Sequence, residues 1–135
     1  MKKKLLKYVS LSMVLSMMFS MTALASQSYT QTFTDDYSKV YRDSYNVSHE
    51  LTGSSSCLGT IAWDEGYSGW IVSAHFNTPS AYIDGSSVGV TSHGSTTISG
   101  SYAYQQFNVN NSEHYLTSHL SCDEYGDASY YTSCN

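Results

Sequence analysis

The stretch from Cys57 to Phe76 constrains the fold more than any other part of the chain. It contains both tryptophans, and its apolar residues alternate with polar ones at the period of two that is typical of a β-strand. One face of a first strand carries Cys57, Gly59, Ile61 and Trp63, and one face of a second carries Trp70, Val72, Ala74 and Phe76. The intervening DEGYSG is a turn-rich connection of hairpin length. We therefore predict an antiparallel hairpin with both of these faces, including both tryptophans, in the core.

The rest of the chain after residue 25 also favours short strands separated by turns. Alternating patterns occur at 29–33, 37–51, 97–109 and 114–122, and a last strand is predicted at 129–134. Turn signals are Asp84-Gly85, His93-Gly94, Asn110-Asn111 and the loop DEYGD at 123–127, and LTGSSS at 51–56 is interpreted as a turn or exposed loop. About seven to nine short strands result, which predicts an all-β fold, a small antiparallel β-sandwich or a partly open barrel.

Two segments leave alternatives open. In 37–51, Tyr37, Tyr41 and Tyr45 are spaced four residues apart, so a helix capped by Asp35 competes with a strand. The middling helix propensity of this segment favours the strand. In 97–109 the apolar phase changes at Gln105-Gln106, which indicates a β-bulge or a change in the sheet that the strand faces.

Residues 1–25 have the pattern of a cleavable secretory signal peptide. Lysines at positions 2, 3, 4 and 7 precede an apolar run over 9–24, and Ala23-Leu24-Ala25 supplies the small residues that signal peptidase requires. An uncleaved membrane anchor is the alternative, but serines and a threonine interrupt a run that is already near the lower length limit for a spanning helix. We expect cleavage after Ala25, no stable membrane insertion afterwards, and a single secreted, extracellular β-domain over 26–135. The lysine-led signal is typical of a bacterial protein.

Removal of this leader makes the remaining domain strongly acidic. Residues 26–135 keep only Lys39 and Arg42 against all eleven carboxylates, which gives a formal net charge of −9. Phosphate backbones and anionic bilayers repel such a chain, so nucleic-acid binding and direct attack on membranes are disfavoured. The high aromatic content argues against disorder.

The three cysteines are an odd number for an oxidising compartment, so one disulfide and one remaining thiol form the simplest arrangement. A Cys122–Cys134 bond is favoured because a local bond orders the chain end, with Cys57 as the alternative partner of either. A catalytic thiolate is disfavoured, because Cys57 and Cys122 lie on apolar faces and basic residues are nearly absent.

The loop DEYGD is the candidate metal site. Asp123, Glu124 and Asp127 offer oxygen ligands of the kind that calcium prefers, but they match no complete EF-hand, and a solvated acidic turn is the alternative. No other cofactor is indicated. The five histidines show no metal-binding spacing, and no Gly-x-Ser-x-Gly elbow supports a serine hydrolase, so no catalytic residue is assigned.

Tyrosines supply the candidate binding surface, because phenol rings that face solvent together suit a glycan or a protein partner. Tyr67 lies in the DEGYSG turn, Tyr125 lies in DEYGD, and Tyr115 has the polar parity of its strand. The sequence therefore predicts a small secreted, non-enzymatic β-sandwich that binds an extracellular glycan or protein surface. A bacteriocin-like exported antagonist and a small secreted hydrolase are the alternatives.

Overall fold

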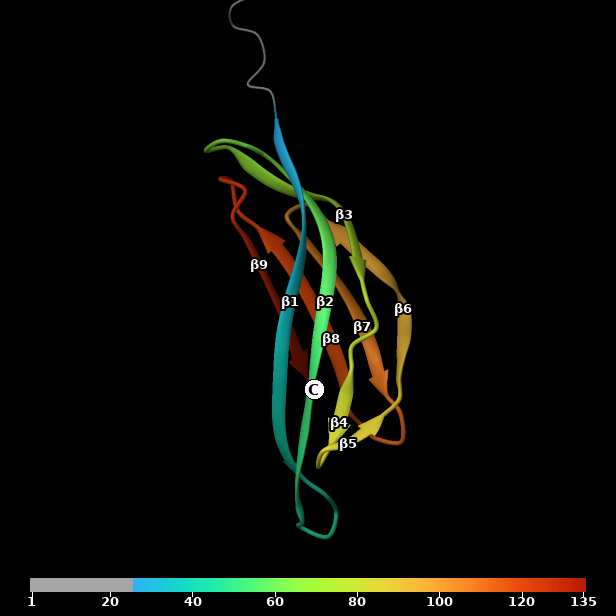
Figure 1. Cartoon of the computed structure of the whole chain (residues 1–135). Coiled ribbons are helices and arrows are strands. Elements are labelled where there is room, and N and C mark those ends of the chain that lie inside the picture. The colour runs from blue at the N-terminus through green and yellow to red at the C-terminus, as the bar shows by residue number, and fades with distance from the viewer. Residues whose placement is uncertain (1–25) are drawn as a thin grey trace, which may run out of the picture.

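The computed structural model describes residues 26–135, and all regular structure there is β-strand (Figure 1). The strands are β1 (Gln27–Arg42), β2 (Ser48–Asp64), β3 (Ser68–Phe76), β4 (Ala81–Ile83), β5 (Ser86–Val88), β6 (Val90–Ser99), β7 (Tyr102–Val109), β8 (Tyr115–Cys122) and β9 (Ala128–Cys134). The all-β antiparallel prediction is confirmed. The predicted signal peptide, residues 1–25, lies outside the described residues. Within the described part of the chain, no helix has the length and apolar character needed to cross a membrane.

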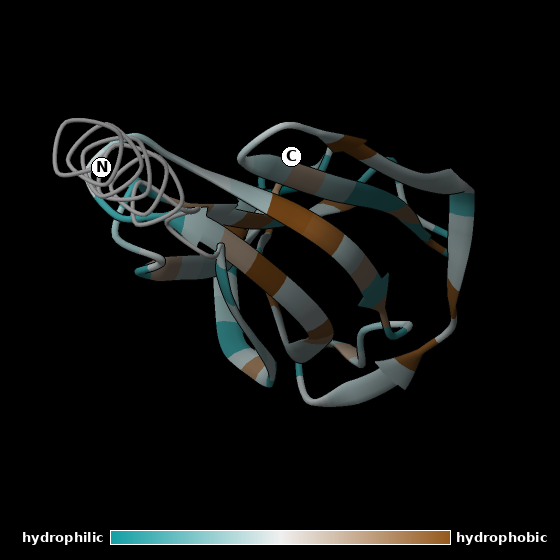
Figure 2. Ribbon diagram, turned by 90° about the horizontal axis from the view of Figure 1, so that it is seen from above, coloured by the Kyte–Doolittle hydropathy of each residue, from teal (hydrophilic) through white to brown (hydrophobic). Residues whose placement is uncertain are grey.

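The strands form two antiparallel sheets that pack face to face. Sheet A has the order β1-β2-β4-β5, with β3 also paired to β2, and sheet B has the order β6-β7-β8-β9. In Figure 1, β1 and β2 lie in front of β8 and β9, and Figure 2 shows apolar bands on strands around the interior. Both sheets contribute to one buried cluster, whose largest fully buried side chains are Phe107, Leu51, Ile61, Leu116 and Leu120. Removal of these apolar side chains from water is the main force that holds the sheets together.

Strands β1 and β2 are longer than the sequence predicts, at 16 and 17 residues. The segment 37–51 is neither one strand nor a helix, because it contains the end of β1, a turn at 43–47 and the start of β2. The segment LTGSSS, interpreted as a loop, lies within β2. Its polarity is accommodated because Ser55 is buried and hydrogen-bonds through Oγ to Thr132 Oγ1 of sheet B at 2.6 Å.

A β-bulge in β3 overturns part of the predicted hairpin. Thr60 pairs with Ser73 and Ile61 pairs with Ile71, so Val72 has no partner on β2. The extra residue reverses the facing of the strand, and Ile71 is buried whereas Val72 is exposed. Trp70 lies opposite Ala62 on the outer face, so the prediction that Trp70 and Val72 face the core is wrong. The inward face of β2, from Cys57 to Trp63, is confirmed.

The segment 97–109 is divided by a turn at Gly100-Ser101, and His93-Gly94 lies inside β6 and is not a turn between strands. The register irregularity falls on β6, between His93 and Thr97, whereas β7 keeps one register against β8. Ala103 and Phe107 of β7 therefore face the core, and Tyr102 and Tyr104 face outward. The turns predicted at Asp84-Gly85, Asn110-Asn111 and 123–127 are confirmed.

Candidate binding face

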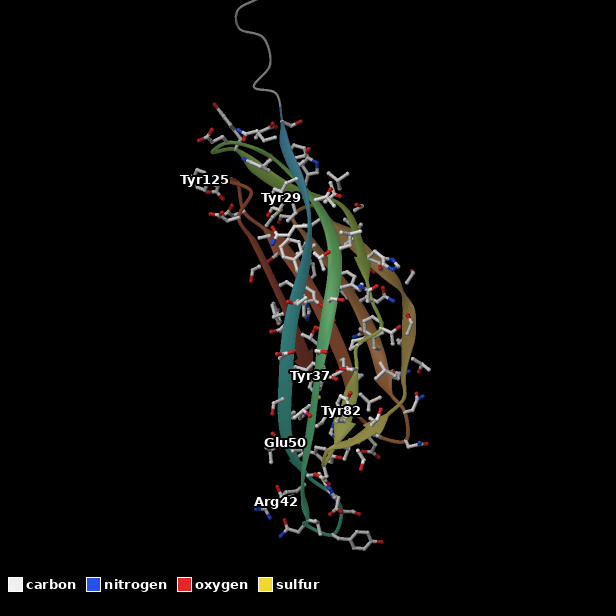
Figure 3. The ribbon with its side chains drawn as sticks, in the orientation of Figure 1. Tyr29, Tyr37, Arg42, Glu50, Tyr82 and Tyr125 are labelled. Atoms are coloured by element: carbon white, nitrogen blue, oxygen red, sulfur yellow. The ribbon has the colours of Figure 1, made fainter. Side chains whose placement is uncertain are left out.

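The turns that carry Tyr67 and Tyr125 lie together at one end of the sandwich. The Gly66 N–H donates a hydrogen bond to the Glu124 carbonyl oxygen at 3.2 Å, which joins the β2–β3 turn to the β8–β9 turn. Both phenol side chains are exposed, at 78% and 57%. Figure 3 shows Tyr125 at this end and Arg42 at the other. Tyr115 begins β8 at the end away from Tyr125, so the structure brings only two of the three predicted tyrosines together.

The glycine of the DEYGD turn explains how this end is built. Gly126 has φ of +83°, and a Cβ there would lie 2.4 Å from the Trp63 indole. The Tyr29 hydroxyl donates a hydrogen bond to the Gly126 carbonyl oxygen at 2.9 Å. Only glycine combines this backbone conformation with such a close approach. The turn is therefore fixed on top of Trp63.

The three candidate calcium ligands share this turn but do not surround one point. Oδ1 of Asp123 accepts hydrogen bonds from the Tyr125 and Asp127 N–H groups, both at 2.9 Å, so this oxygen shapes the turn. Asp123, Glu124 and Tyr67 instead line part of an open cavity of about 230 Å³. Among residues 26–135, no group of three or more His, Cys, Asp or Glu side chains is placed to hold a metal ion.

The three cysteines are free thiols, and the favoured Cys122–Cys134 disulfide is wrong. In the β8–β9 register Cys122 lies opposite Ala128, whereas Cys134 lies opposite Leu116. The two therefore stand at opposite ends of the hairpin, about 20 Å apart at roughly 3.4 Å per residue, and a disulfide needs Cα atoms within about 7 Å. The alternative partner, Cys57, lies between Phe33 and Phe76 in the middle of sheet A. Burial raises its pKa to about 11, which disfavours a thiolate nucleophile.

The outer face of sheet B carries a group of aromatic, hydroxyl and amide side chains. We call it the neutral face and define it by the outward residues of three strands: Tyr102, Tyr104, Gln106 and Asn108 of β7, Tyr115, Thr117, His119 and Ser121 of β8, and Ser129, Tyr131 and Ser133 of β9. None of the strands β6 to β9 contains an Asp, Glu, Lys or Arg. The carboxylates lie on sheet A and in the turns, so this face is uncharged in an otherwise acidic domain.

Three aromatic rings form a row across the neutral face. Tyr104, His119 and Tyr131 lie directly opposite one another on β7, β8 and β9. The His119 ring stacks on Tyr131 with centroids 4.6 Å apart and planes at 19°, and it lies 6.4 Å from the Tyr104 ring. Tyr131 stays 48% exposed on an edge strand of sheet B. The row ends in an aromatic ring that is available to a ligand.

Tyr102 completes the cluster, because its hydrogen bond to His119 determines which ring nitrogen of the neutral imidazole is the acceptor. Its hydroxyl hydrogen-bonds to His119 Nδ1, and its ring lies 5.6 Å from the imidazole. Burial lowers the pKa of His119 and raises the pKa of Tyr102. Both groups are therefore neutral near pH 7, with the phenol as donor and Nδ1 as acceptor. The cluster holds no formal charge.

The sequence contained a signal for this cluster that our interpretation missed. The apolar phase change predicted at Gln105-Gln106 rests on counting Tyr102 and Tyr104 with Ile98, which has the same parity. Had the phase been taken from Ala103, Phe107 and Val109, both tyrosines would have been placed outside.

The other four histidines do not join His119. His49 and His114 instead flank Tyr41 at the opposite end from Tyr125, with ring centroids 5.5 Å and 4.2 Å away.

Compared with known proteins, the chain matches no family model, no curated protein and no solved structure.

Proposed function

We propose that residues 26–135 are a secreted, extracellular, non-enzymatic module that binds an uncharged glycan on the neutral face. The observation that carries this proposal is the placement of four aromatic rings on a sheet whose strands hold no charged residue. In a domain of net charge −9, such a surface favours a neutral ligand over a charged one.

The chemistry of the neutral face suits a sugar chain. The C–H face of a pyranose packs against an aromatic ring, and Tyr131 offers one that is 48% exposed. The hydroxyl and amide groups of the same face, among them Ser129, Ser133 and Gln106, donate and accept hydrogen bonds as sugar hydroxyls require. A protein surface is the other partner class predicted from the sequence, and it becomes an outcome of the test. No specific observation among residues 26–135 favours the antagonist or the hydrolase.

The test is co-sedimentation of the purified secreted protein with insoluble cellulose, chitin and xylan. We expect binding to at least one of them, little dependence on salt, and a loss of affinity of about tenfold or more in Tyr131→Ala, which corresponds to ~1.4 kcal/mol. Tyr45→Ala is the matched control, because Tyr45 is 86% exposed in the β1–β2 turn, outside the neutral face.

Equal affinity of the Tyr131→Ala and Tyr45→Ala variants contradicts the proposal. Binding that disappears as salt is raised contradicts it too, since a neutral ligand is insensitive to screening. Capture of a surface protein by the same face, without binding to any glycan, replaces the glycan with a protein partner.

A further inference from the structure

A single histidine joins two turns at the end of the molecule opposite Tyr125. His49 Nε2 lies 3.1 Å from Asp43 Oδ2, and His49 Nδ1 lies 2.6 Å from Asp84 Oδ2. Asp43 begins the β1–β2 turn and Asp84 begins the β4–β5 turn. Figure 1 shows both turns at this end, and Figure 3 places Arg42 and Glu50 there. The imidazole is therefore a bridge between segments that are distant in sequence.

The two hydrogen bonds require two N–H donors on the imidazole ring, and neutral histidine has only one. An ionised carboxylate only accepts hydrogen bonds, and a neutral imidazole has one N–H donor. Both ring nitrogens face carboxylates, so both bonds form only when His49 is an imidazolium. Loss of one proton removes one bond and leaves two carboxylates on either side of an uncharged ring.

The carboxylates are held in place by backbone N–H groups, which belong to its own turn for Asp43 and to strand β2 for Asp84. Asp43 Oδ1 accepts the Tyr45 and Val47 N–H groups, both at 2.9 Å. Asp84 Oδ1 accepts the Glu50 N–H at 2.9 Å. Each aspartate thus uses Oδ1 for the backbone and Oδ2 for His49. Neither carboxylate can turn away from the ring without giving up a backbone bond.

We propose that a proton on His49 locks the β1–β2 turn to the β4–β5 turn, and that loss of this proton as the pH rises releases the two turns from each other. The lock borders a cavity of about 330 Å³ beside the β1–β2 turn, lined in part by Tyr41, Asp43 and His114. Release of the β1–β2 turn changes the wall of this cavity. The lock is independent of glycan binding on the neutral face.

The charged and titratable groups around the lock come from every element that meets there. They are Tyr41 and Arg42 of β1, Asp43 of the first turn, Glu50 of β2, Asp84 of the β4–β5 turn, and Glu113 and His114 of the β7–β8 turn. Arg42 Nη1 bonds to Asn46, at 3.2 Å to the carbonyl and 3.1 Å to Oδ1. Among residues 26–135, the only side chains that hydrogen-bond to the His49 ring are the two aspartates.

The directions of the pKa shifts set the pH range of the lock. The hydrogen bonds from Asp84 and then Asp43 raise the pKa of His49, so its stabilisation is present below the ordinary pKa of about 6.5 and is lost as pH rises through the raised value. The Val47 backbone bond, then His49, lowers the pKa of Asp43, and His49 lowers that of Asp84. Their stabilisation is present above about pH 4 and is lost as pH falls through the lowered values.

The test is an NMR titration of the His49 ring nitrogens in the secreted protein, together with amide exchange at Tyr45, Val47 and Glu50. We expect His49 to titrate above pH ~6.5. We also expect these amides to lose protection, beyond the intrinsic effect of base, over the same pH range. In Asp84→Asn the His49 pKa falls, and the pH-dependent step in exchange disappears. Asparagine keeps the Oδ1 acceptor and tolerates the φ of 50° at position 84, so the turn is preserved.

His93→Gln on β6 is the matched control and leaves both measurements unchanged. Titration of wild-type His49 at or below the ordinary pKa overturns the proposal. A raised pKa with amide protection that does not follow it shows that the proton bridges the aspartates without locking the turns, which also overturns the proposal.

Discussion

The outer faces of the two sheets follow the same alternating pattern and carry different chemistry. On sheet A, the outward residues of β1 are mainly hydroxyls with charges at intervals, in the order Ser28, Thr30, Thr32, Thr34, Asp36, Ser38, Val40 and Arg42. Thr30 and Thr60 hydrogen-bond through their hydroxyls at 2.8 Å across this face. On sheet B, the neutral face replaces the charges with tyrosines and His119.

The difference shows that solubility does not explain the neutral face. The hydroxyls and charges of sheet A already give a hydrated outer surface. Sheet B has four aromatic rings together on its outer face, although threonine would satisfy the β-propensity of these positions equally well. Charge is absent from the strands that carry these rings, and the proposed glycan binding rests on this property.

The largest expected effect distinguishes the inside of sheet A from its outer face. Trp63 faces the core, under Gly126 and 5.7 Å from the Tyr29 ring, whereas the bulge at Val72 places Trp70 outside. We expect Trp63→Ala to cost about 3 kcal/mol of unfolding free energy, and Trp70→Ala to cost ~1 kcal/mol or less. Urea denaturation of both variants measures the difference. Equal losses of unfolding free energy would indicate that both indoles are in the core. They would contradict the outward placement of Trp70 by the bulge.

Much of the fold follows from sequence periodicity and turn residues. The inward face of β2 was read correctly because Cys57, Ile61 and Trp63 alternate without interruption. The turn at Asp84-Gly85 is predicted because an Asp-Gly dipeptide suits positive φ, and both residues adopt it in the structure, at 50° and 80°. These signals depend on residues that are close in sequence, and the folded chain adopts the local structure that they predict.

The errors arose where the deciding partner is distant in sequence. Asp35 lies between two predicted strands, 29–33 and 37–51, but its carboxylate accepts the Thr132 N–H at 2.8 Å and β1 continues through it. Ser55 resembles a loop residue, but its hydroxyl is satisfied by Thr132 in the other sheet. The bulge at Val72 depends on register with β2, and the row of Tyr104, His119 and Tyr131 depends on register in sheet B. Composition and spacing do not specify such pairings.

The second prediction concerns a buried hydroxyl contact between the two sheets, and we expect an intermediate effect on the unfolding free energy. Thr132 Oγ1 contacts Ser55 Oγ of sheet A and Ser118 Oγ of sheet B, at 2.6 Å and 2.8 Å, inside the core. Thr132→Val keeps the shape and the backbone N–H but leaves two buried hydroxyls short of a partner, which costs about 1–3 kcal/mol. Thr30→Val is the control, because it breaks a similar hydroxyl pair on the exposed face of sheet A and changes stability by about 0.5 kcal/mol or less. A similar loss in both variants would show that the buried contact contributes nothing special.

The smallest effect tests the neutrality of sheet B directly, by adding one carboxylate to each outer face. Gln106→Glu places a charge on the neutral face, beside Thr117 and two residues from Tyr104, with almost no change in shape. Thr32→Glu places the same charge on the hydroxyl face of sheet A. Both variants should keep their melting temperature, because exposed substitutions change stability by about 0.5 kcal/mol or less.

Gln106→Glu should weaken glycan binding about three- to tenfold, up to ~1.4 kcal/mol, because a carboxylate loses water when a neutral ligand covers it. Thr32→Glu should bind as the wild type does. Co-sedimentation of the two variants side by side makes the measurement, and lowering the pH to protonate the new glutamate should restore binding in Gln106→Glu. Equal affinities would show that charge placement on the two sheets is unrelated to binding, and the difference between the faces would then be one of composition alone.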